Sequence, residues 1–481
     1  MEDLFLIILI GILALDTTVA FQTMIAQPLF SCTLVGGYLG DWYTGLQLGM
    51  LLQLLWLNLI PAGGTRFPES NLASMVITVL VVEYQPEHLP HGVFALSLII
   101  GIAVAYAGQW LTILDRRINT LILRMAKQYI DRNRLKWLGE VNILGGFKSF
   151  LLLGCLAGWG IIGGRFLCFD LLPRMGERWE AYLQLLQPAV WGIGLAMAFF
   201  LVLNMLRTIK KPGARTPAPS PAPAGPVLRK WPFWEQLAVF FRSLFIQATW
   251  NYKSMLSIGF QNSMLPALRR LYPDLAKQVT CAARHLDFFN AHPYLASYAL
   301  GVAVRLEEDH VRGDTGAAEK LVRLKGLLIS ILGALGDRLF WGIIKPASMM
   351  LGVLLAAALP TLPAQLGGLA FTFLVYNFPH FRVRFRGLRL GYREGLLVNR
   401  ELREEKFRNY FIIYSWIGIA AYILLWVALS VEMIVEDVLH FASIFGAALL
   451  AGGLYRFRPN FYMSLLLTLL FAVIVGVVIS R

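Results

Sequence analysis

Long apolar runs separated by short polar segments extend along the whole sequence. Several runs reach the roughly 20 residues that a helix needs to cross the hydrocarbon core of a bilayer. They lie near 92–114, 146–164, 188–206, 409–431, 437–454 and 461–480. This pattern predicts an all-helical protein that crosses a membrane several times.

The first four apolar runs are different, because several are short and contain Gly or Pro. They lie near 4–22, 28–40, 46–62 and 71–83. Short, interrupted apolar segments are typical of broken or re-entrant helices, which transporters use around a substrate site near the bilayer midplane. The first run follows acidic rather than basic residues, so we interpret it as a retained transmembrane segment and not as a signal peptide.

Other stretches have mixed polarity. Residues 115–136 are basic, with apolar positions at helical spacing, and predict an amphipathic helix on the cytoplasmic surface. Residues 231–245 predict a second amphipathic stretch. We expect two short spans in 347–378, broken near Pro360 to Pro363, followed by a basic cytoplasmic loop over 381–408.

A Pro/Ala-rich tract, KKPGARTPAPSPAPAGPVLRK, divides the chain. This composition cannot form a packed core and is typical of a semi-rigid linker. Basic residues at both of its ends indicate the cytoplasmic side. We therefore expect membrane domains over 1–208 and 231–481, joined by a linker over 209–230.

Composition supports a membrane protein, since 57% of the 481 residues are hydrophobic and only 15% are charged. Soluble domains carry about 25% charged residues. The net charge of +14 comes from Lys and Arg clustered in loops, which favours positive-inside topology and anionic lipid over nucleic acid. We expect no metal, cofactor or catalytic residue, because the cysteines lack metal-ligand spacing and no phosphate-binding Gly loop or Ser/His/Asp constellation is found.

The candidate chemistry is concentrated in a polar seam over 241–273. An apolar background there carries Gln247, Trp250, Asn251 and Tyr252. Polar amides inside a membrane must face protein, water or a ligand. On a helix Gln247 and Asn251 would share a face, and amides beside aromatic rings suit a sugar. The alternative is hydrogen bonding between packed helices.

The second domain resembles the IID subunit of mannose/fructose/sorbose-family phosphotransferase-system permeases. Five motifs carry the resemblance in order: QATWNYKSMLSIGF, SMLPALRRLYP, RHLDFFNAHPYLASYALGVAVRLEE, GDRLFWGIIKP and LRLGYREG. The first domain is similar to the partner subunit IIC through QPLFSCTLVGGYLGD, TGLQLGMLLQLLWLNLIPAGG, PESNLASMVITVLV and AGQWLTILDRRI. The chain thus resembles a fusion of the two subunits.

This resemblance implies that the domains share a related helical fold in inverted orientation and bind the sugar between them. It also implies a homotrimer in a bacterial inner membrane, with phosphate supplied by a phosphohistidine on a cytoplasmic IIB subunit that works with IIA. No residue of this chain would then be phosphorylated. Compared with the family, the first domain is expected to be shorter by about two spans.

The resemblance also directs attention to three acidic or amide residues. Glu69 and Asn71 follow the turn GGTRFPES, and Glu69 stands where the family usually has Asp. Glu69 could accept hydrogen bonds from a sugar or pair with Arg66. Asp337, expected after a Gly-rich turn, could line the site or pair with Arg338.

Three further acidic residues, Glu307, Glu308 and Asp309, are interpreted as a solvated helix end, and His285 as a structural hydrogen-bonding residue. The basic segments 115–136 and 379–408 suit either IIB docking or lipid headgroups. The leading function is a sugar permease for a mannose-type hexose or an amino sugar. The alternatives are a non-transporting sensor that binds sugar or IIB, and a facilitator without phosphorylation.

Overall fold

Nearly all of the chain is helical in the computed structural model, which describes residues 2–59, 66–84, 90–134, 136–174, 176–210, 230–436, 438–457 and 460–480. Within these ranges the only β pairing is two isolated bridges, from Met255 to Asn251 and to Phe289. Seven helices of the described residues are long and apolar enough to cross a membrane. The prediction of an all-α membrane protein is confirmed.

The described residues of the first half form eight α-helices, and the predicted short helices near its start are confirmed. These are α1 (Glu2–Thr18), α2 (Pro28–Tyr38), α3 (Trp42–Leu55) and α4 (Ser70–Glu83). They are followed by α5 (Pro90–Asp131), α6 (Lys136–Leu171), α7 (Glu177–Leu183) and α8 (Leu186–Lys210). Helices α2 and α3 pack closely because Gly36 faces Gly45, where an added Cβ would lie 2.6 Å from the Gly45 Cα.

The predicted helix over 115–136 is confirmed as far as Asp131, but it is the end of a longer helix. Helix α5 runs without a break from Pro90 to Asp131, 42 residues in all. Its basic end is held in the helix by packing, since Ile122, Leu123 and Ala126 are buried against Ile258 and Leu286 of the second half. Leu121 and Met125, which we expected on the apolar face, are exposed.

The second half begins with three short helices, α9 (Phe233–Ser243), α10 (Ser257–Leu271) and α11 (Leu275–His285). Helix α12 (Ala296–Val311) follows, then α13 (Ala317–Gly336), which continues through a π-helical segment, η2 (Asp337–Ile344), into α14 (Lys345–Ala358). Helices α15 (Leu362–Glu394), α16 (Glu404–Glu436), α17 (Val438–Phe457) and α18 (Phe461–Ile479) complete the half.

Two expectations for this half need correction. Asp337 does not follow a turn, because α13, η2 and α14 form one continuous helix from Ala317 to Ala358. The segment 381–408 is mostly not a loop, since α15 stays helical to Glu394 and is followed by a 3-10 turn over Gly395–Arg400. The predicted break near Pro360 is confirmed between α14 and α15, where the Thr361 side chain accepts a hydrogen bond from the Ala364 amide.

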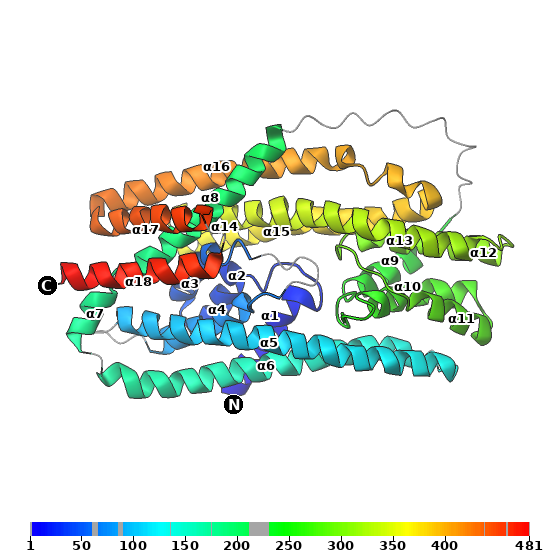
Figure 1. Ribbon diagram of the computed structural model, residues 1–481, viewed down its shortest axis with the longest axis horizontal. Coiled ribbons are helices and arrows are strands. Elements are labelled where there is room, and N and C mark those ends of the chain that lie inside the picture. Colours follow the sequence, from blue (N-terminus) through cyan, green and yellow to red (C-terminus); the bar gives the residue numbers. More distant parts are fainter. Residues whose placement is uncertain are drawn as a thin grey trace.

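The long helices run roughly along one axis, with α5 and α6 on one side and α13 to α16 on the other (Figure 1). The short helices α1 to α4 lie between these two layers, and α9 to α11 lie towards one end (Figure 1). Helix α8 of the first half packs against α16, α17 and α18 of the second. The two halves therefore share an extensive interface. Linker residues 211–229 lie outside the described residues.

Candidate substrate site between the two halves

The centre of the interface is a buried polar network around Gln22, which lies in the connection between α1 and α2. The Gln22 side-chain amide donates to the Gln247 Oε1 at 2.9 Å. Its backbone carbonyl accepts a hydrogen bond from the Tyr294 hydroxyl at 2.8 Å. Arg384 donates to the backbone carbonyl of Ser243 at 2.5 Å and to the Gln22 Oε1 at 3.5 Å. Gln22, Tyr294 and Arg384 are all fully buried, so the network is shielded from solvent.

The connection from residue 19 to 27 adopts a strained backbone. Phe21, Gln22 and Met24 have φ values of +58°, +55° and +73°. A left-handed non-Gly residue costs roughly 1–2 kcal/mol, and such strain persists only where surrounding contacts fix it. Here the second half provides them: the Phe21 amide donates to the Leu244 carbonyl at 2.8 Å, and Asn377 donates to the Thr23 carbonyl at 2.9 Å.

Asp16 fixes the same connection from within the first half. One carboxylate oxygen accepts from the Thr23 amide at 2.7 Å and from the Thr23 hydroxyl at 2.9 Å. The second oxygen accepts from the Ala26 amide at 3.5 Å. Asp16 is thus buried, hydrogen-bonded and placed at the end of a broken helix.

A small polar cavity of about 20 Å³ opens beside Asp16 where the two halves meet. The first half lines it with a carboxylate and two amides, from Asp16, Gln27 and Asn71. The second half contributes Lys345 and Trp341, with the Lys345 Nζ 5.8 Å from the centre of the Trp341 ring. Lys345 is only 4% exposed. Hydrogen-bonding groups of both charges beside an aromatic face are the groups that recognise a polyhydroxylated ring.

A second polar cavity, of about 40 Å³, lies on the other side of the connection. Gln247 and Trp250 of the second half line it, opposite Thr112 and Arg116 of α5. The Arg116 guanidinium lies over the Trp250 ring, 4.3 Å from its centre. This cavity is built around a cation–π contact.

Three residues predicted from sequence lie at these cavities. Asn71 lines the first cavity and donates to the Thr17 hydroxyl at 3.0 Å. Gln247 and Trp250 line the second, and Gln247 also contacts Gln22.

Asn251 and Tyr252 have a different environment from the one expected. Residues 244–256 form successive turns rather than a helix, so the four-residue spacing does not place Gln247 and Asn251 on one face. The buried Asn251 side chain accepts from the amides of Lys253 and Ser254 at 3.0 and 2.9 Å, and donates to the Thr249 carbonyl at 3.2 Å. Tyr252 is 38% exposed. Asn251 therefore stabilises a turn.

Neither of the two acidic candidates lines the first cavity. Glu69 is buried and accepts from the Thr112 hydroxyl at 2.7 Å; within the described residues this contact replaces the expected pairing with Arg66, which is exposed. Asp337 is half-buried at the start of η2. Arg338 pairs with Glu404 and not with Asp337, because the helix directs adjacent side chains apart.

The expected solvated helix end at Glu307 and Glu308 is wrong, since they are only 1% and 5% exposed. Glu307 accepts from the Tyr272 hydroxyl at 2.6 Å and contacts the His285 Nε2 at 2.9 Å. The predicted structural role of His285 is confirmed. Glu308 is hydrogen-bonded to Tyr392 and Arg312.

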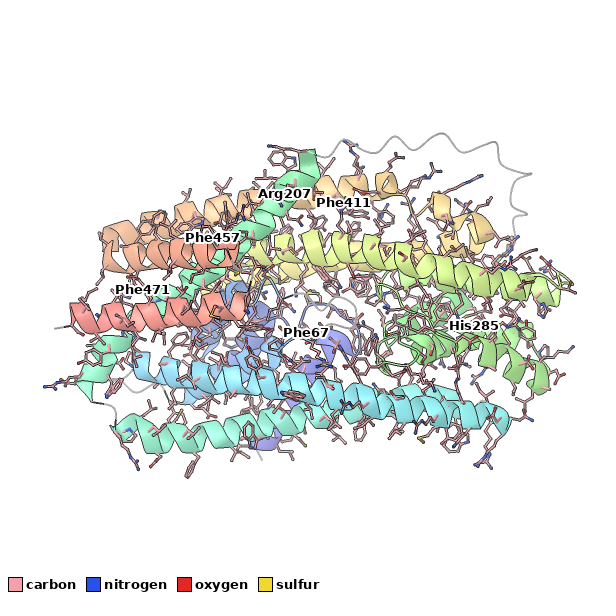
Figure 2. The ribbon with its side chains drawn as sticks, in the orientation of Figure 1. Phe67, Arg207, His285, Phe411, Phe457 and Phe471 are labelled. Atoms are coloured by element: carbon pink, nitrogen blue, oxygen red, sulfur yellow. The ribbon has the colours of Figure 1, made fainter. Side chains whose placement is uncertain are left out.

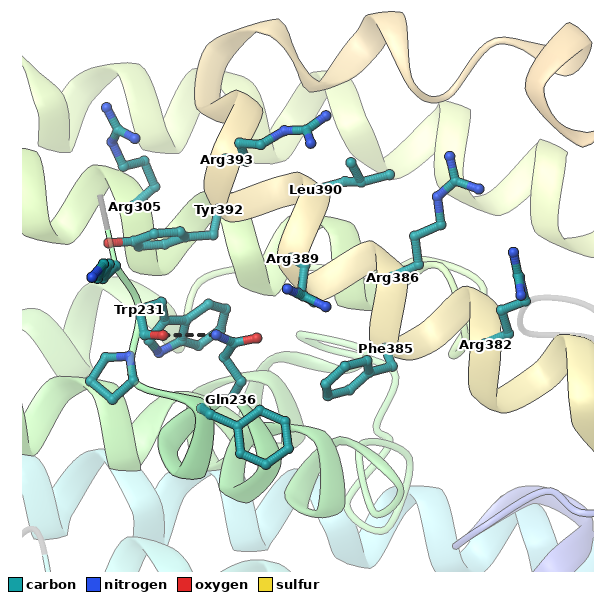
Figure 3. Close-up of a pocket in the computed structure, with 13 residues that line it drawn as sticks. Trp231, Gln236, Arg305, Arg382, Phe385, Arg386, Arg389, Leu390, Tyr392 and Arg393 are labelled. Carbon is teal, nitrogen blue, oxygen red and sulfur yellow. Dashed lines mark hydrogen bonds between the residues drawn. The ribbon is translucent and has the colours of Figure 1, made fainter. Parts of the chain in front are cut away.

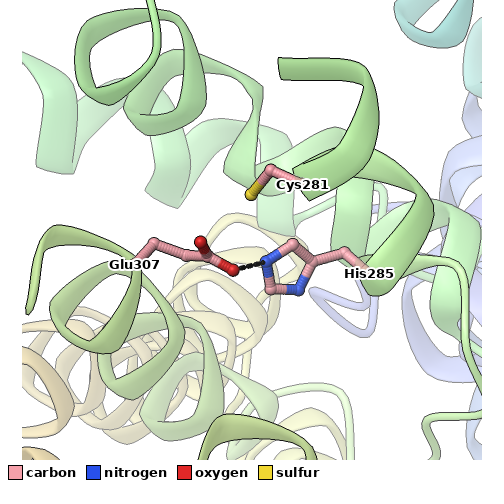
Figure 4. Close-up of side chains that lie close together, drawn as sticks. All are labelled: Cys281, His285 and Glu307. Carbon is pink, nitrogen blue, oxygen red and sulfur yellow. Dashed lines mark hydrogen bonds and ion pairs between the residues drawn. The ribbon is translucent and has the colours of Figure 1, made fainter. Parts of the chain in front are cut away.

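Cys281, His285 and Glu307 lie close enough together to suggest a metal site (Figure 4). The Glu307 carboxylate is, however, already occupied by Tyr272 and His285, and the Arg284 Nε lies 3.5 Å away. A guanidinium at that distance disfavours a second cation. We interpret the cluster as a hydrogen-bond network; it lies towards one end of the molecule, whereas Phe67, beside the first cavity, lies near the middle (Figure 2).

Several site residues were not identified from the sequence. Asp16 and Lys345 are isolated charges near or within apolar runs, which is a usable signal for function in a membrane. Arg384 lies among the other arginines of a basic segment, so its charge gives no such signal. Gln22 and Tyr294 carry no comparable signal, because their roles depend on contacts between residues far apart in the chain.

Two family models match the two halves of the chain. The model described as "PTS system mannose/fructose/sorbose family IID component" matches residues 235–477, and "PTS system sorbose-specific iic component" matches residues 2–208.

Individual relatives match parts of the chain. The mannose-specific EIID component of Escherichia coli K12 is 35% identical over 171 residues, which are 34% of this chain and 56% of the relative. The sorbose-specific EIIC component of Klebsiella pneumoniae is 32% identical over 123 residues, 26% of this chain and 43% of the relative. The chain thus spans about half the length of the curated relatives it matches.

Among solved structures, a cryo-EM structure of the mannose transporter ManYZ with microcin E492 is 30% identical, with a TM-score of 0.33 over 40% of this chain and 70% of that one. The IID model by itself covers half of this chain, and the IIC model covers most of the remainder. The chain belongs to the mannose/fructose/sorbose family of phosphotransferase-system permeases, as a fusion of IIC and IID components.

Proposed function

We propose that this chain is the membrane permease of a phosphoenolpyruvate-dependent phosphotransferase system that takes up a mannose-type hexose or an amino sugar. The observation that carries the proposal is the cavity between the two halves, where Asp16 and Asn71 face Trp341 and Lys345. Neither half supplies this set of groups by itself. A sugar bound there would be recognised by both components at once.

The proposed assembly follows the family. Residues 1–208 act as the IIC-like domain, 231–481 as the IID-like domain, and 209–230 as the linker that keeps the two at a high effective concentration. The domains are related by inverted topology and assemble as a homotrimer in a bacterial cytoplasmic membrane. IIA and IIB are the cytoplasmic partners, and the phosphohistidine resides on IIB. A sugar hydroxyl attacks its phosphorus as the P–N bond breaks, so the phosphoryl group passes to the sugar and to no residue of this chain.

The cavity must expand before it can hold a sugar. A volume of about 20 Å³ accommodates about one water molecule, whereas small-molecule sites typically measure several hundred Å³. The first half contributes Asp16, Gln27 and Asn71. The second half contributes Trp341 from η2 and Lys345 from α14. We therefore propose that the α1–α2 connection and the Trp341–Lys345 segment separate when sugar enters, and that the described conformation is closed.

The site residues have distinct proposed roles. Asp16 accepts hydrogen bonds from sugar hydroxyls, and Lys345 donates hydrogen bonds to them. Gln27 and Asn71 both donate and accept, and Trp341 offers an aromatic face to the sugar ring. Gln247 and Trp250 support the interface beside the second cavity. We do not assign a sugar contact to Asn251, Tyr252, Glu69 or Asp337.

Reconstitution tests the proposal. Vesicles carrying the full chain, with IIA, IIB, the general phosphotransferase proteins and phosphoenolpyruvate on the cytoplasmic side, are expected to convert labelled sugar into sugar phosphate. Uptake of unmodified sugar without phosphoenolpyruvate would instead show a facilitator. Sugar binding without any product would show a sensor. Omission of IIB is the matched control and is expected to abolish product.

A further inference from the structure

A large open pocket lies away from the polar interface, between the start of α9 and the C-terminal end of α15. It measures about 870 Å³. Its basic lining is Lys230, Arg305, Arg382, Arg386, Arg389 and Arg393, and none of the described residues that line it is Asp or Glu. Trp231, Phe385 and Tyr392 supply aromatic walls (Figure 3). The pocket therefore combines strong positive charge with apolar surface.

Three arginines of α15 are available for a ligand. Among the described residues no carboxylate forms an ion pair with Arg382, Arg386 or Arg389, whereas Arg393 pairs with Glu394 and Arg305 with Asp309. Arg389 is directed towards Trp231 and Gln236 (Figure 3). Guanidinium groups are well suited to bind phosphate through paired hydrogen bonds.

The face of α15 that carries Arg382, Arg386 and Arg389 continues into an exposed apolar stripe. Phe371, Leu374 and Phe378 are 55%, 65% and 63% exposed, and Arg382 begins one turn after Phe378, with its guanidinium 5.8 Å from that ring. The residue spacing of three or four keeps the apolar side chains and the arginines on one face. A molecule that covers this face is apolar along Phe371 to Phe378 and anionic beyond Arg382.

The position of this change in polarity matches a membrane surface. Residues 362–381 contain no Asp, Glu, Lys or Arg, and at 1.5 Å per residue they extend for roughly 30 Å, the thickness of a bilayer hydrocarbon core. Helix α9 provides independent support, since Phe233 and Trp234 beside the pocket are 56% and 77% exposed. Exposed aromatic side chains concentrate at the headgroup level of membranes.

We propose that this pocket binds the headgroup of an anionic phospholipid of the cytoplasmic leaflet. The lipid phosphate contacts Arg386 and Arg389, and the acyl chains lie along Phe371, Leu374 and Phe378. The positive-inside rule places the basic end of α15 at the cytoplasmic leaflet, where anionic lipids attract basic side chains. This site is separate from the proposed sugar site and does not depend on transport.

The test is a lipid titration of the purified full chain, followed by native mass spectrometry. Phosphatidylglycerol is the anionic probe and phosphatidylcholine the zwitterionic one. The wild type is expected to retain phosphatidylglycerol in preference to phosphatidylcholine. Arg386→Gln/Arg389→Gln is expected to weaken that binding by about 30-fold, because each arginine near an anionic headgroup contributes a factor of roughly five.

A matched control removes the same charge elsewhere. Arg124 and Arg132 are exposed on the basic end of α5, and Arg124→Gln/Arg132→Gln is expected to change binding by less than about twofold, the effect of general charge alone. Arg386→Lys/Arg389→Lys is expected to give intermediate binding, because charge is kept and the paired hydrogen bonds are lost.

Three results would overturn the proposal. The first is equal loss of lipid in the site and control variants. The second is saturation by inorganic phosphate at the same concentration as the lipid, which would show a soluble-anion site. The third is unchanged lipid binding in the site variant together with lost binding of phosphorylated IIB, which would show a protein docking face.

Discussion

The two halves meet through two irregular connections that are stabilised in different ways. In the α1–α2 connection, Gln22 and Thr23 accept hydrogen bonds from Tyr294 and Asn377 of the other half, and Gln22 donates one to Gln247. In the α9–α10 connection, Asn251 is satisfied by groups within three residues of itself. Thr249 and Trp250, next to Asn251, are hydrogen-bonded to Asn142 and Asn119 of the first half. The α1–α2 connection can therefore respond to movement between the halves, whereas the Asn251 turn is held by its own segment.

The largest effect is expected where the first connection is anchored. Arg384→Ala removes a fully buried guanidinium that donates to Ser243 and Gln22. Leaving buried acceptors unsatisfied and creating a cavity is expected to lower the free energy of unfolding by about 3 kcal/mol or more. Thermal unfolding in detergent measures the change.

The control for this variant is Arg323→Ala, at a surface ion pair whose Arg323 side chain is 78% exposed. Exposed pairs contribute about 0–1 kcal/mol. Similar melting temperatures for the two variants would contradict a structural role for the buried network.

The next largest effect on stability is expected from the backbone strain of the α1–α2 connection. Gln22 has φ of +55°, and an Ala there loses the amide contacts while keeping the strain. Gln22→Gly loses the same contacts but accepts left-handed backbone readily. The Gly variant is expected to be more stable than the Ala variant by about 1 kcal/mol. A Gly variant less stable than Ala would mean that the connection is not strained.

A smaller, local effect is expected in the second connection. Asn251→Ala removes the acceptor for the Lys253 and Ser254 amides and is expected to lower stability by about 1 kcal/mol. Asn251→Asp keeps that acceptor and should recover most of the loss. Equal stability of Asn251→Ala and wild type would show that the turn does not depend on this side chain.

The smallest effect is expected at Tyr252, whose ring is 38% exposed and contacts Trp250 edge-on. Tyr252→Ala is expected to change the free energy of unfolding by less than about 0.5 kcal/mol. A larger loss would mean that the wall of the second cavity needs this ring.

The sequence predicted the membrane class, the short helices near the start and the break at Pro360, because these depend on local polarity and on Gly and Pro. The polar seam also identified Gln247 and Trp250, and the family resemblance pointed to Asn71. The sequence did not predict that 244–256 would be non-helical, because the Asn251 turn and the bridges to Met255 compete with helical spacing. Gln22 and Tyr294 could not be predicted, since their contact joins residues 272 positions apart.

Contacts between residues far apart in the chain also explain the errors at charged positions. Glu307 looked solvated beside two other acids, but Tyr272 and His285 compensate its burial. Residues 115–131 looked like a separate surface helix, but packing of Ile122 and Leu123 on α10 and α11 keeps them in α5. Distant partners decided both outcomes.

Equilibrium binding of a labelled mannose-type sugar to the reconstituted chain tests the central claim most directly, when Asn71→Ala and Asn251→Ala are compared. Asn71 lines the cavity between the halves, and Asn251 lies in the self-contained turn. A hydrogen bond to sugar of about 1.5 kcal/mol corresponds to roughly tenfold in affinity. We predict that Asn71→Ala weakens binding by about tenfold and that Asn251→Ala changes it by less than about twofold. The reverse result would contradict a sugar site at this cavity.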